Sequence, residues 1–175
     1  MKLQIRRSIF ETNSSSTHAV SIFRGGPYDI PERITIRPGE FGWECETYSC
    51  PEDKLSYLYT WILEKCNSYD YNDVTQKYES HYDYKKLKDY QYRLKSKLLE
   101  AGVKEVEFET CGGYWENGYI DHSENLYNDD LEAILENYFL DYVFNYASYI
   151  ETGNDNDDYD VCEAAGADYS FYKSN

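Results

Sequence analysis

The hydroxyl-rich segment 13–18 contains the residue types in this sequence that most readily do chemistry. It holds one amide, four consecutive hydroxyls and one imidazole: Asn13, Ser14, Ser15, Ser16, Thr17 and His18. A histidine beside a serine can act as the general base that activates a hydroxyl nucleophile. The catalytic candidates are therefore Ser14, Ser16 and His18. No Asp, His and Ser order in the sequence matches a known triad arrangement, so this segment alone does not establish a hydrolase.

The same segment is also a candidate anion-binding site. Successive turn amides and hydroxyls form concavities that hold anions, and a nearby arginine strengthens them through charge-assisted hydrogen bonds. The candidate residues are Arg6, Arg7, Ser14, Ser15, Ser16, Thr17 and His18, with Arg24 also near in sequence. Such a site would take a phosphate-bearing nucleotide, in a small enzyme or a ligand sponge. The structural alternative is a Ser/Thr turn that satisfies its own backbone, with His18 starting a strand.

Residues 6–18 read R-R-S-I-F-E-T-N-S-S-S-T-H. This string resembles the opening of a scattered group of small phage and prophage proteins of Gram-positive bacteria, which begin R-R-x-x-F-E-T-N-S-S-S-T-H. The resemblance covers about residues 6–24, and no settled activity is attached to it. It implies an origin in a phage or mobile element, where small acidic proteins often inhibit host machinery.

Negative charge is concentrated in the last third of the chain. The 175 residues carry 17 Lys and Arg against 33 Asp and Glu, a net charge of −16. Residues 111–175 hold fifteen of those acids and a single basic residue, Lys173. This surplus argues against direct binding to DNA, which needs clustered cations. An acidic surface would instead attract the basic groove of a nucleic-acid-handling protein.

Carboxylates on a rigid surface can imitate the phosphates of a nucleic acid, and tyrosines among them add contact area at low entropic cost. The candidate partner-binding residues are Asp129, Asp130, Glu132, Glu136, Asp141, Tyr138, Asp155, Asp157 and Asp158. The alternative is a solvated helix face followed by an acidic tail. The basic stretch 85–97 is expected to be a solvated face, and docking of it against the acidic third, in the same chain or in a homo-oligomer, stays open.

The elements that would position these residues follow from periodicity and turn signals. Composition predicts a turn at 13–17, and the pair Asn117–Gly118 predicts a hairpin. Alternation predicts strands at 2–6, 18–24, 33–37 and 103–109. Helical spacing predicts helices at 51–66, 79–101 and 129–148, with Pro51, Gly102 and Asn128 at their ends. The expected fold is α+β, a small, mainly antiparallel sheet with about three helices packed on one face. We expect a single domain over 1–150 and an acidic tail over 151–175.

Metals, cofactors and membranes are not indicated. Five cysteines, an odd number with no secretion signal before them, are typical of thiols in a reducing compartment. Cys45 and Cys50 have a C-x4-C spacing without a second pair, which does not suit structural zinc. The acidic stretch 154–160 lacks the glycine and glutamate of a calcium loop. No apolar run approaches the ~20 residues of a membrane span, so we expect a cytoplasmic protein.

The composition and the motifs favour a binding protein over an enzyme. The leading hypothesis is a phage-encoded inhibitor of the anti-CRISPR or anti-restriction type, whose acidic, tyrosine-rich surface blocks a host nucleic-acid-handling protein. The alternative is a nucleotide-binding enzyme or sponge built on residues 13–18. A third hypothesis is an accessory protein that only assembles with other phage proteins.

Overall fold

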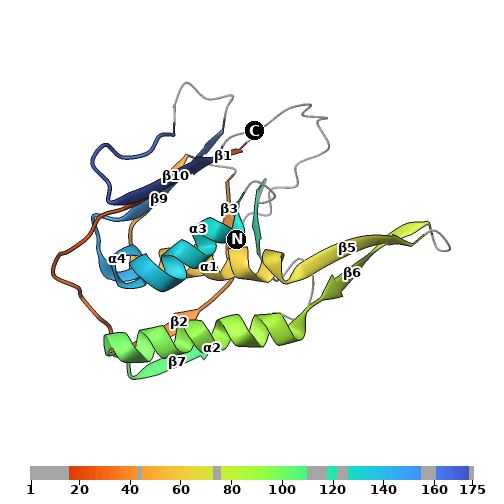
Figure 1. Ribbon diagram of the computed structural model, residues 1–175, viewed down its shortest axis with the longest axis horizontal. Coiled ribbons are helices and arrows are strands. Elements are labelled where there is room, and N and C mark those ends of the chain that lie inside the picture. Colours follow the sequence, from red (N-terminus) through yellow and green to blue (C-terminus); the bar gives the residue numbers. More distant parts are fainter. Residues whose placement is uncertain are drawn as a thin grey trace, which may run out of the picture.

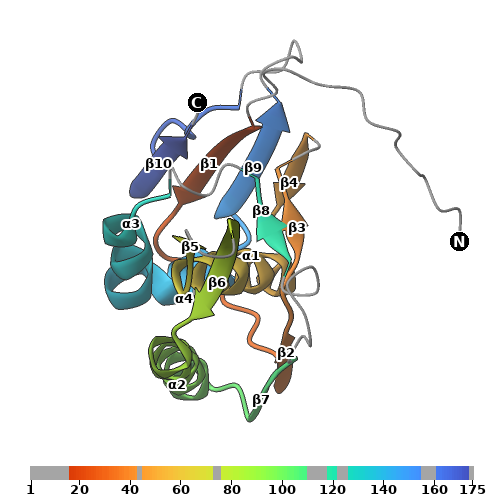
Figure 2. The ribbon, with the colours of Figure 1, turned by 90° about the vertical axis from the view of Figure 1, so that its right-hand side faces the viewer.

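The computed structural model describes residues 16–42, 45–72, 76–109, 118–121, 126–154 and 161–173. Within them the chain forms three layers (Figures 1 and 2). A four-stranded sheet lies on one side, helices form the middle, and a long helix beside a two-stranded sheet forms the far side. No described helix is long and apolar enough to cross a bilayer.

The main sheet is antiparallel, with the strand order β10-β1-β9-β4. Its strands are β1 (Ser16–Ile22), β4 (Glu46–Tyr48), β9 (Tyr149–Asn154) and β10 (Tyr169–Lys173). Strand β1 is buried along its whole length. Val20 pairs with Ile150 and Phe171, and all three belong to the core, so one face of the sheet is apolar where the helices cover it.

Helix α1 (Pro51–Lys65) runs through the middle layer. It begins where the sequence predicts, with Pro51 in the first turn, a position that needs no amide hydrogen. The Trp61 ring contacts Phe171 of the sheet at a centroid distance of 5.8 Å, while Tyr59 contacts Phe108 of the opposite layer at 5.3 Å. The helix is therefore buried on both sides.

Smaller two-stranded sheets complete the described fold. β2 (Arg33–Ile36) pairs with β7 (Glu105–Phe108), and β3 (Glu40–Phe41) pairs with β8 (Tyr119–Ile120), both in parallel. β5 (Asn67–Asn72) and β6 (Lys77–Tyr82) form an antiparallel hairpin, which connects α1 to the second long helix along the chain. The predicted α+β class is confirmed, because the largest sheet is antiparallel and helices pack on one face of it.

The second long helix, α2 (Tyr84–Ala101), starts later than the predicted 79–101. The residues expected in its first turn form β6, and the polar stretch before them contains β5. Asp83 caps the helix by accepting a hydrogen bond from the Lys86 amide at 3.0 Å. The predicted cap Gly102 is confirmed, with a φ of 113°. Tyrosine favours strands as well as helix faces, so helical spacing misassigned this tyrosine-rich stretch.

The third helical segment, 128–144, consists of three pieces: α3 (Asn128–Ala133), the π-helical turn η3 (Ile134–Tyr138) and α4 (Phe139–Phe144). It ends at Phe144, not at the predicted 148. Asn128 is its first helical residue and not its cap; Tyr127 holds the cap position, and its side chain does not cap the helix.

Next to the predicted hairpin at Asn117–Gly118, the described residues pair with a distant segment of the chain. Tyr119 and Ile120 form β8, which pairs in parallel with β3, and residues 110–117 lie outside the described part of the chain. Gly118 has a φ of 66°, and a Cβ there would approach the Gly39 carbonyl oxygen to 2.1 Å. The glycine therefore permits two backbones to pass closely.

The described residues after 150 do not form a tail. β9 is an internal strand of the main sheet and β10 is an edge strand. Pairing with β1 draws Ile150 and Phe171 into the core, even though many neighbours of these residues in sequence are acidic. Residues 155–160 lie outside the described part of the chain.

Candidate functional site

Side chains from other elements hold the carboxylates of helical segment 128–144 in place. Arg93 of α2 donates to both carboxylate oxygens of Glu132, at 3.1 and 2.5 Å, and to Glu136 at 2.7 Å. Tyr90, one turn earlier on α2, donates to Glu132 at 3.0 Å. The Arg93 guanidinium holds the pKa of the Glu132 carboxyl below its ordinary value. Part of the basic stretch 85–97 thus docks on the acidic third within the chain.

Asp130 and Asp141 accept hydrogen bonds from residues outside α2. Tyr169 of β10 donates to Asp130 at 2.9 Å. Asp141 accepts bonds from the Tyr28 hydroxyl at 2.5 Å and from the Gly25 amide at 3.0 Å. The hydrogen bond to Asp141 raises the pKa of the Tyr28 hydroxyl. The two carboxylates are therefore fixed by partners that are far away in sequence.

Tyr138, the aromatic residue predicted to bind a partner, is half-buried within this surface. Its ring stacks on Tyr169 with centroids 4.7 Å apart, and the Arg24 guanidinium lies over it at 4.7 Å. A cation over an aromatic face is attractive. Arg24, expected beside the hydroxyl-rich segment, is therefore engaged at the acidic helix instead.

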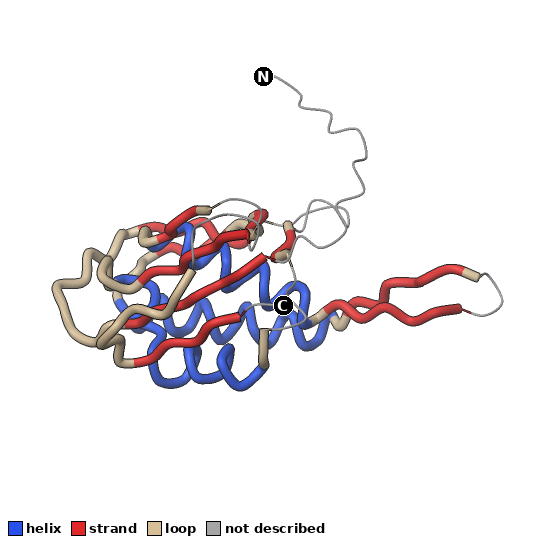
Figure 3. The backbone as a smooth tube through the Cα atoms, turned by 90° about the horizontal axis from the view of Figure 1, so that it is seen from above, coloured by secondary structure: helices blue, strands red, loops and turns tan. Residues whose placement is uncertain are grey.

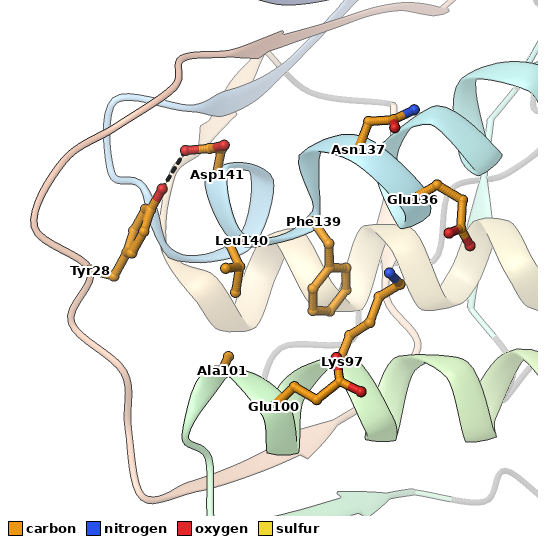
Figure 4. Close-up of a pocket in the computed structure, with 9 residues that line it drawn as sticks. All are labelled: Tyr28, Lys97, Glu100, Ala101, Glu136, Asn137, Phe139, Leu140 and Asp141. Atoms are coloured by element: carbon orange, nitrogen blue, oxygen red, sulfur yellow. Dashed lines mark hydrogen bonds between the residues drawn. The ribbon is translucent and has the colours of Figure 1, made fainter.

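An open pocket of about 300 Å³ lies between this helical segment and the end of α2 (Figure 4). Its charged lining consists of Lys97, Glu100, Glu136 and Asp141. Tyr28, Phe139 and Leu140 add apolar surface, and Leu140 is 41% exposed. Because three carboxylates face one amine, the pocket favours a cationic group with an apolar stem.

The other predicted partner-binding residues are less informative. Asp129 is exposed in the first turn of α3, where a carboxylate is favoured by the helix dipole. Asp155, Asp157 and Asp158 lie outside the described residues. Of the predicted partner-binding residues, those that the structure describes therefore all lie on segment 128–144.

Ser16 and His18 are brought together, but inside the protein. They lie in β1 and are 4% and 1% exposed. Residues two apart on a strand share a face, and the Ser16 Oγ lies 3.1 Å from the His18 Nε2. The predicted turn at 13–17 is wrong for its last two residues, because Ser16 and Thr17 pair with Asn154 and Gly153 of β9.

The hydrogen bonds around His18 do not suit a general base. Its Nε2 lies 2.9 Å from the Asp121 carbonyl oxygen, which can only accept, so Nε2 carries a proton. The Ser16 hydroxyl donates to the same carbonyl at 2.9 Å. Nδ1 faces the Tyr57 hydroxyl at 3.4 Å. A serine nucleophile needs an unprotonated nitrogen beside its hydroxyl, so this cluster is a buried polar network.

The described residues do not assemble the predicted anion site either. Thr17 lies on the opposite face of β1 from Ser16 and His18, against Gly153 and Val161. Arg6, Arg7, Ser14 and Ser15 lie outside the described residues. The hydroxyls of Ser16 and Thr17 are separated because neighbouring residues of a strand point to opposite faces, whereas the sequence predicted a turn here.

Sequence reasoning missed Lys54, which is fully buried on α1. Its Nζ donates to the carbonyl oxygens of Asn145 and Ser148, at 2.8 and 3.0 Å, just beyond the end of α4. The Tyr142 hydroxyl donates to the Lys54 carbonyl oxygen at 2.9 Å. Burial lowers the pKa of Lys54 to about 8. A cation at a helix C-terminus is favourable, and the sequence signal was a lysine beside the apolar stripe of α1.

Thiols and metal ligands contribute no site among the described residues. Cys66 is buried and Cys50 is half-buried, as expected of small hydrophobic side chains, but Cys45 and Cys162 are exposed. None of these four cysteines forms a disulfide, and Cys111 lies outside the described residues. The described residues contain no group of three or more side chains suited to a metal ion.

No protein-family model, curated protein or solved structure matches this chain.

Proposed function

We propose that this protein is a phage-encoded inhibitor that binds a host nucleic-acid-handling protein in the host cytoplasm, in the manner of an anti-CRISPR or anti-restriction protein. Its acidic face, defined as the carboxylates Asp129, Asp130, Glu132, Glu136 and Asp141, occupies the groove that normally holds a nucleic acid. The mechanism is steric and electrostatic competition without a chemical step.

The observation that carries this proposal is the way the acidic face is held. Arg93, Tyr169 and Tyr28, from three separate segments of the chain, fix four of its five carboxylates. The spacing of the charges is thus set before a partner arrives, and preorganised groups lose less entropy on binding. Arg93 neutralises part of the charge, but the Glu136 side chain remains 56% exposed beside it.

The pocket beside the acidic face suits a lysine or arginine side chain of the partner. Glu136 and Asp141 border it, and Leu140 offers an exposed apolar contact for the stem of that side chain. A basic groove carries many such side chains. One of them seated in the pocket would fix the orientation of the complex, while the remaining carboxylates contribute long-range attraction.

The alternative function, a nucleotide-binding enzyme or sponge, has less support from the described residues. Ser16 and His18 are buried, and the His18 nitrogen beside the serine carries a proton. Thr17 lies on the other face of the strand. A ligand would have to displace strand β1 from the sheet to reach Ser16, Thr17 and His18 together.

Competition with nucleic acid tests the proposal. A protein captured from host lysate at low salt is identified and purified, and its affinity for duplex DNA is measured with increasing amounts of this chain. We expect the apparent dissociation constant for DNA to rise in proportion to the concentration of the chain, and the effect to weaken as salt increases. Asp129→Lys and Glu136→Lys should each reduce the inhibition about tenfold.

Glu107→Lys is the matched control, because Glu107 is exposed on β7, away from the acidic face. It should leave inhibition unchanged, and thermal unfolding should show that all three variants are folded. Equal loss for Glu107→Lys would mean that only net charge matters. DNA binding unaffected by saturating amounts of the chain would reject the proposed competition.

A further inference from the structure

The outer surface of α2 carries basic and aromatic side chains along one stripe. The helix lies at the edge of the far layer, with one side turned away from the core (Figures 1 and 2). Successive residues of an α-helix are rotated by about 100°, and the exposed residues of α2 other than its acids fall within a single arc of about 100°. We call these residues the α2 stripe: Tyr84, Lys85, Lys88, Tyr92, Lys95 and Leu99. Asp89 and Glu100, the acidic residues of α2, lie outside this arc.

The lysines of the α2 stripe have no acidic partner among the described residues. Lys85, Lys88 and Lys95 take part in none of the ion pairs there, whereas Lys104, just before β7, pairs with Glu32. Three unpaired ammonium groups on one helix face are a local cluster of cations in a chain whose net charge is −16. Lysines clustered along a helix are the electrostatic footprint of a nucleic-acid site.

The α2 stripe is separate from the acidic face. Arg93, which binds Glu132 and Glu136 of that face, lies about 140° round the helix from Lys88. A ligand on the stripe therefore approaches from another side of α2. In 0.1 M salt, exposed charges are screened over about 10 Å, which limits the repulsion that the acidic face exerts on an anion at the stripe.

The tyrosines of the α2 stripe present large ring surfaces to solvent. Tyr84 and Tyr92 are 69% and 74% exposed, the two highest values among the large hydrophobic residues that the structure describes. Tyr84 lies at the base of the β5–β6 hairpin, which projects from the body of the protein (Figures 1 and 3). Its ring contacts the Tyr82 ring with centroids 5.4 Å apart. The two exposed rings are about 12 Å apart along the helix axis, so each can stack on a different base.

We propose that the α2 stripe binds a single strand of nucleic acid. Tyr84 and Tyr92 stack on bases, and the three lysines of the stripe contact phosphates beside them. A duplex is a poorer ligand, because its base faces are covered by stacking and leave only phosphates for the stripe. This binding goes beyond the proposed inhibition and does not depend on it, since no carboxylate of the acidic face belongs to the stripe.

An acidic helix of another protein would also complement the lysines. Paired helices, however, bury a seam of apolar side chains, and Leu99 is the only aliphatic residue of the α2 stripe. Such a partner would bury ammonium groups that a nucleic-acid strand leaves partly in water. The alternation of aromatic rings with cations therefore favours the nucleic acid.

Fluorescence anisotropy of a labelled oligothymidylate of about 15 nucleotides, titrated with the full chain, tests the proposal. The logarithm of the association constant should fall against the logarithm of the salt concentration with a slope of about −2, since each of three phosphates contributes about −0.7. Lys88→Gln should reduce the slope to about −1.4. Tyr92→Ala should raise the dissociation constant about tenfold, because the stacking on one base is lost.

Two matched controls change exposed residues outside the α2 stripe. Lys104→Gln removes the same charge as Lys88→Gln, and Tyr146→Ala removes a tyrosine that is 53% exposed beyond the end of α4. Both should bind like the wild type, and thermal unfolding should show that all four variants are folded.

Four outcomes would overturn the proposal. These are no anisotropy change at low salt, equal affinity for a duplex of the same length, equal losses in the controls, and displacement by polyglutamate as effective as by unlabelled oligothymidylate. The last result would assign the α2 stripe to acidic protein segments. Since none of these measurements involves the acidic face, failure here would leave the proposed inhibition standing, and failure of the inhibition would leave this site standing.

Discussion

Arg93 of α2 grips Glu132 of α3 through two nitrogens of its guanidinium, at 3.1 and 2.5 Å, and reaches Glu136 through one of them at 2.7 Å. This contact joins the long outer helix to the acidic segment. One guanidinium, in a chain with few basic residues, thus orders two carboxylates. The acidic face is thereby made rigid at some loss of charge.

Removal of Arg93 should weaken the fold. We expect Arg93→Met to lower the free energy of unfolding by about 1–2 kcal/mol, because three charge-assisted hydrogen bonds at a half-buried position are lost. Urea denaturation followed by tryptophan fluorescence measures the change. Arg33→Met is the control, since the Arg33–Glu105 pair is 65% and 55% exposed and should contribute less than about 0.5 kcal/mol. Equal losses would show that Arg93 is no more than a surface ion pair.

The Arg93–Glu132 contact also predicts part of the acid sensitivity. The pKa of Glu132 is lower in the folded protein than in the unfolded chain. Its contribution to stability is therefore complete above the unfolded pKa and is lost as the pH falls through the folded pKa. Urea midpoints between about pH 6 and pH 3 should fall more steeply for the wild type than for Glu132→Gln. Parallel curves would contradict this assignment.

Lys54 predicts a pH dependence of the same sign at the alkaline end. Burial lowers its pKa to about 8 from the ordinary value of 10.5, so between these values the unfolded chain binds more protons than the folded protein. Stability attributable to Lys54 therefore rises with pH, by about 1 kcal/mol between pH 8 and pH 9. This rise should appear as the difference between the wild type and Lys54→Met in urea denaturation. Subtracting the values for the variant cancels the contributions of other groups that titrate in both proteins. One of them is Cys66, whose pKa is raised by burial to about 11. A constant difference from pH 8 to pH 9 would mean that Lys54 is not desolvated.

Ser16 should behave as a structural hydroxyl. We expect a fluorophosphonate probe, which reacts with activated serines, to leave the native protein unlabelled, because Ser16 is 4% exposed and the adjacent His18 nitrogen is protonated. Ser16→Ala should lower the free energy of unfolding by about 1 kcal/mol through the lost bond to the Asp121 carbonyl. Mass spectrometry of the probed protein checks the first expectation. An adduct at Ser16 would revive the catalytic hypothesis.

Local signals in the sequence were sufficient for some of the elements. Pro51 suits a first turn because its missing amide hydrogen is not needed there, and Gly102 suits the position after a last turn because glycine readily adopts a positive φ; both helix ends are confirmed. Leu55, Leu58 and Ile62 are buried as their spacing predicts. Such features depend on neighbours within one or two turns, which a single sequence displays directly.

Other features depend on partners far away in the chain, and the sequence alone misassigned or missed them. Ile150 belongs to an internal strand only because Val20 lies beside it, and Phe171 reaches the core in the same way. Residues 79–82 carry a helical spacing but pair with β5. Lys54 is buried because the carbonyl groups beyond α4 come within reach of its amine.

The amino-acid sequence by itself determined the acidic character of the last third, the α+β class and the helix ends that obey local backbone rules. Only the tertiary structure decided which carboxylates are fixed, and that Ser16 and His18 are enclosed in a sheet. The physical reason is that charge and local conformation belong to single residues and their neighbours. Burial and ion pairing belong to residues that meet only when distant segments, such as α2 and α3, pack together.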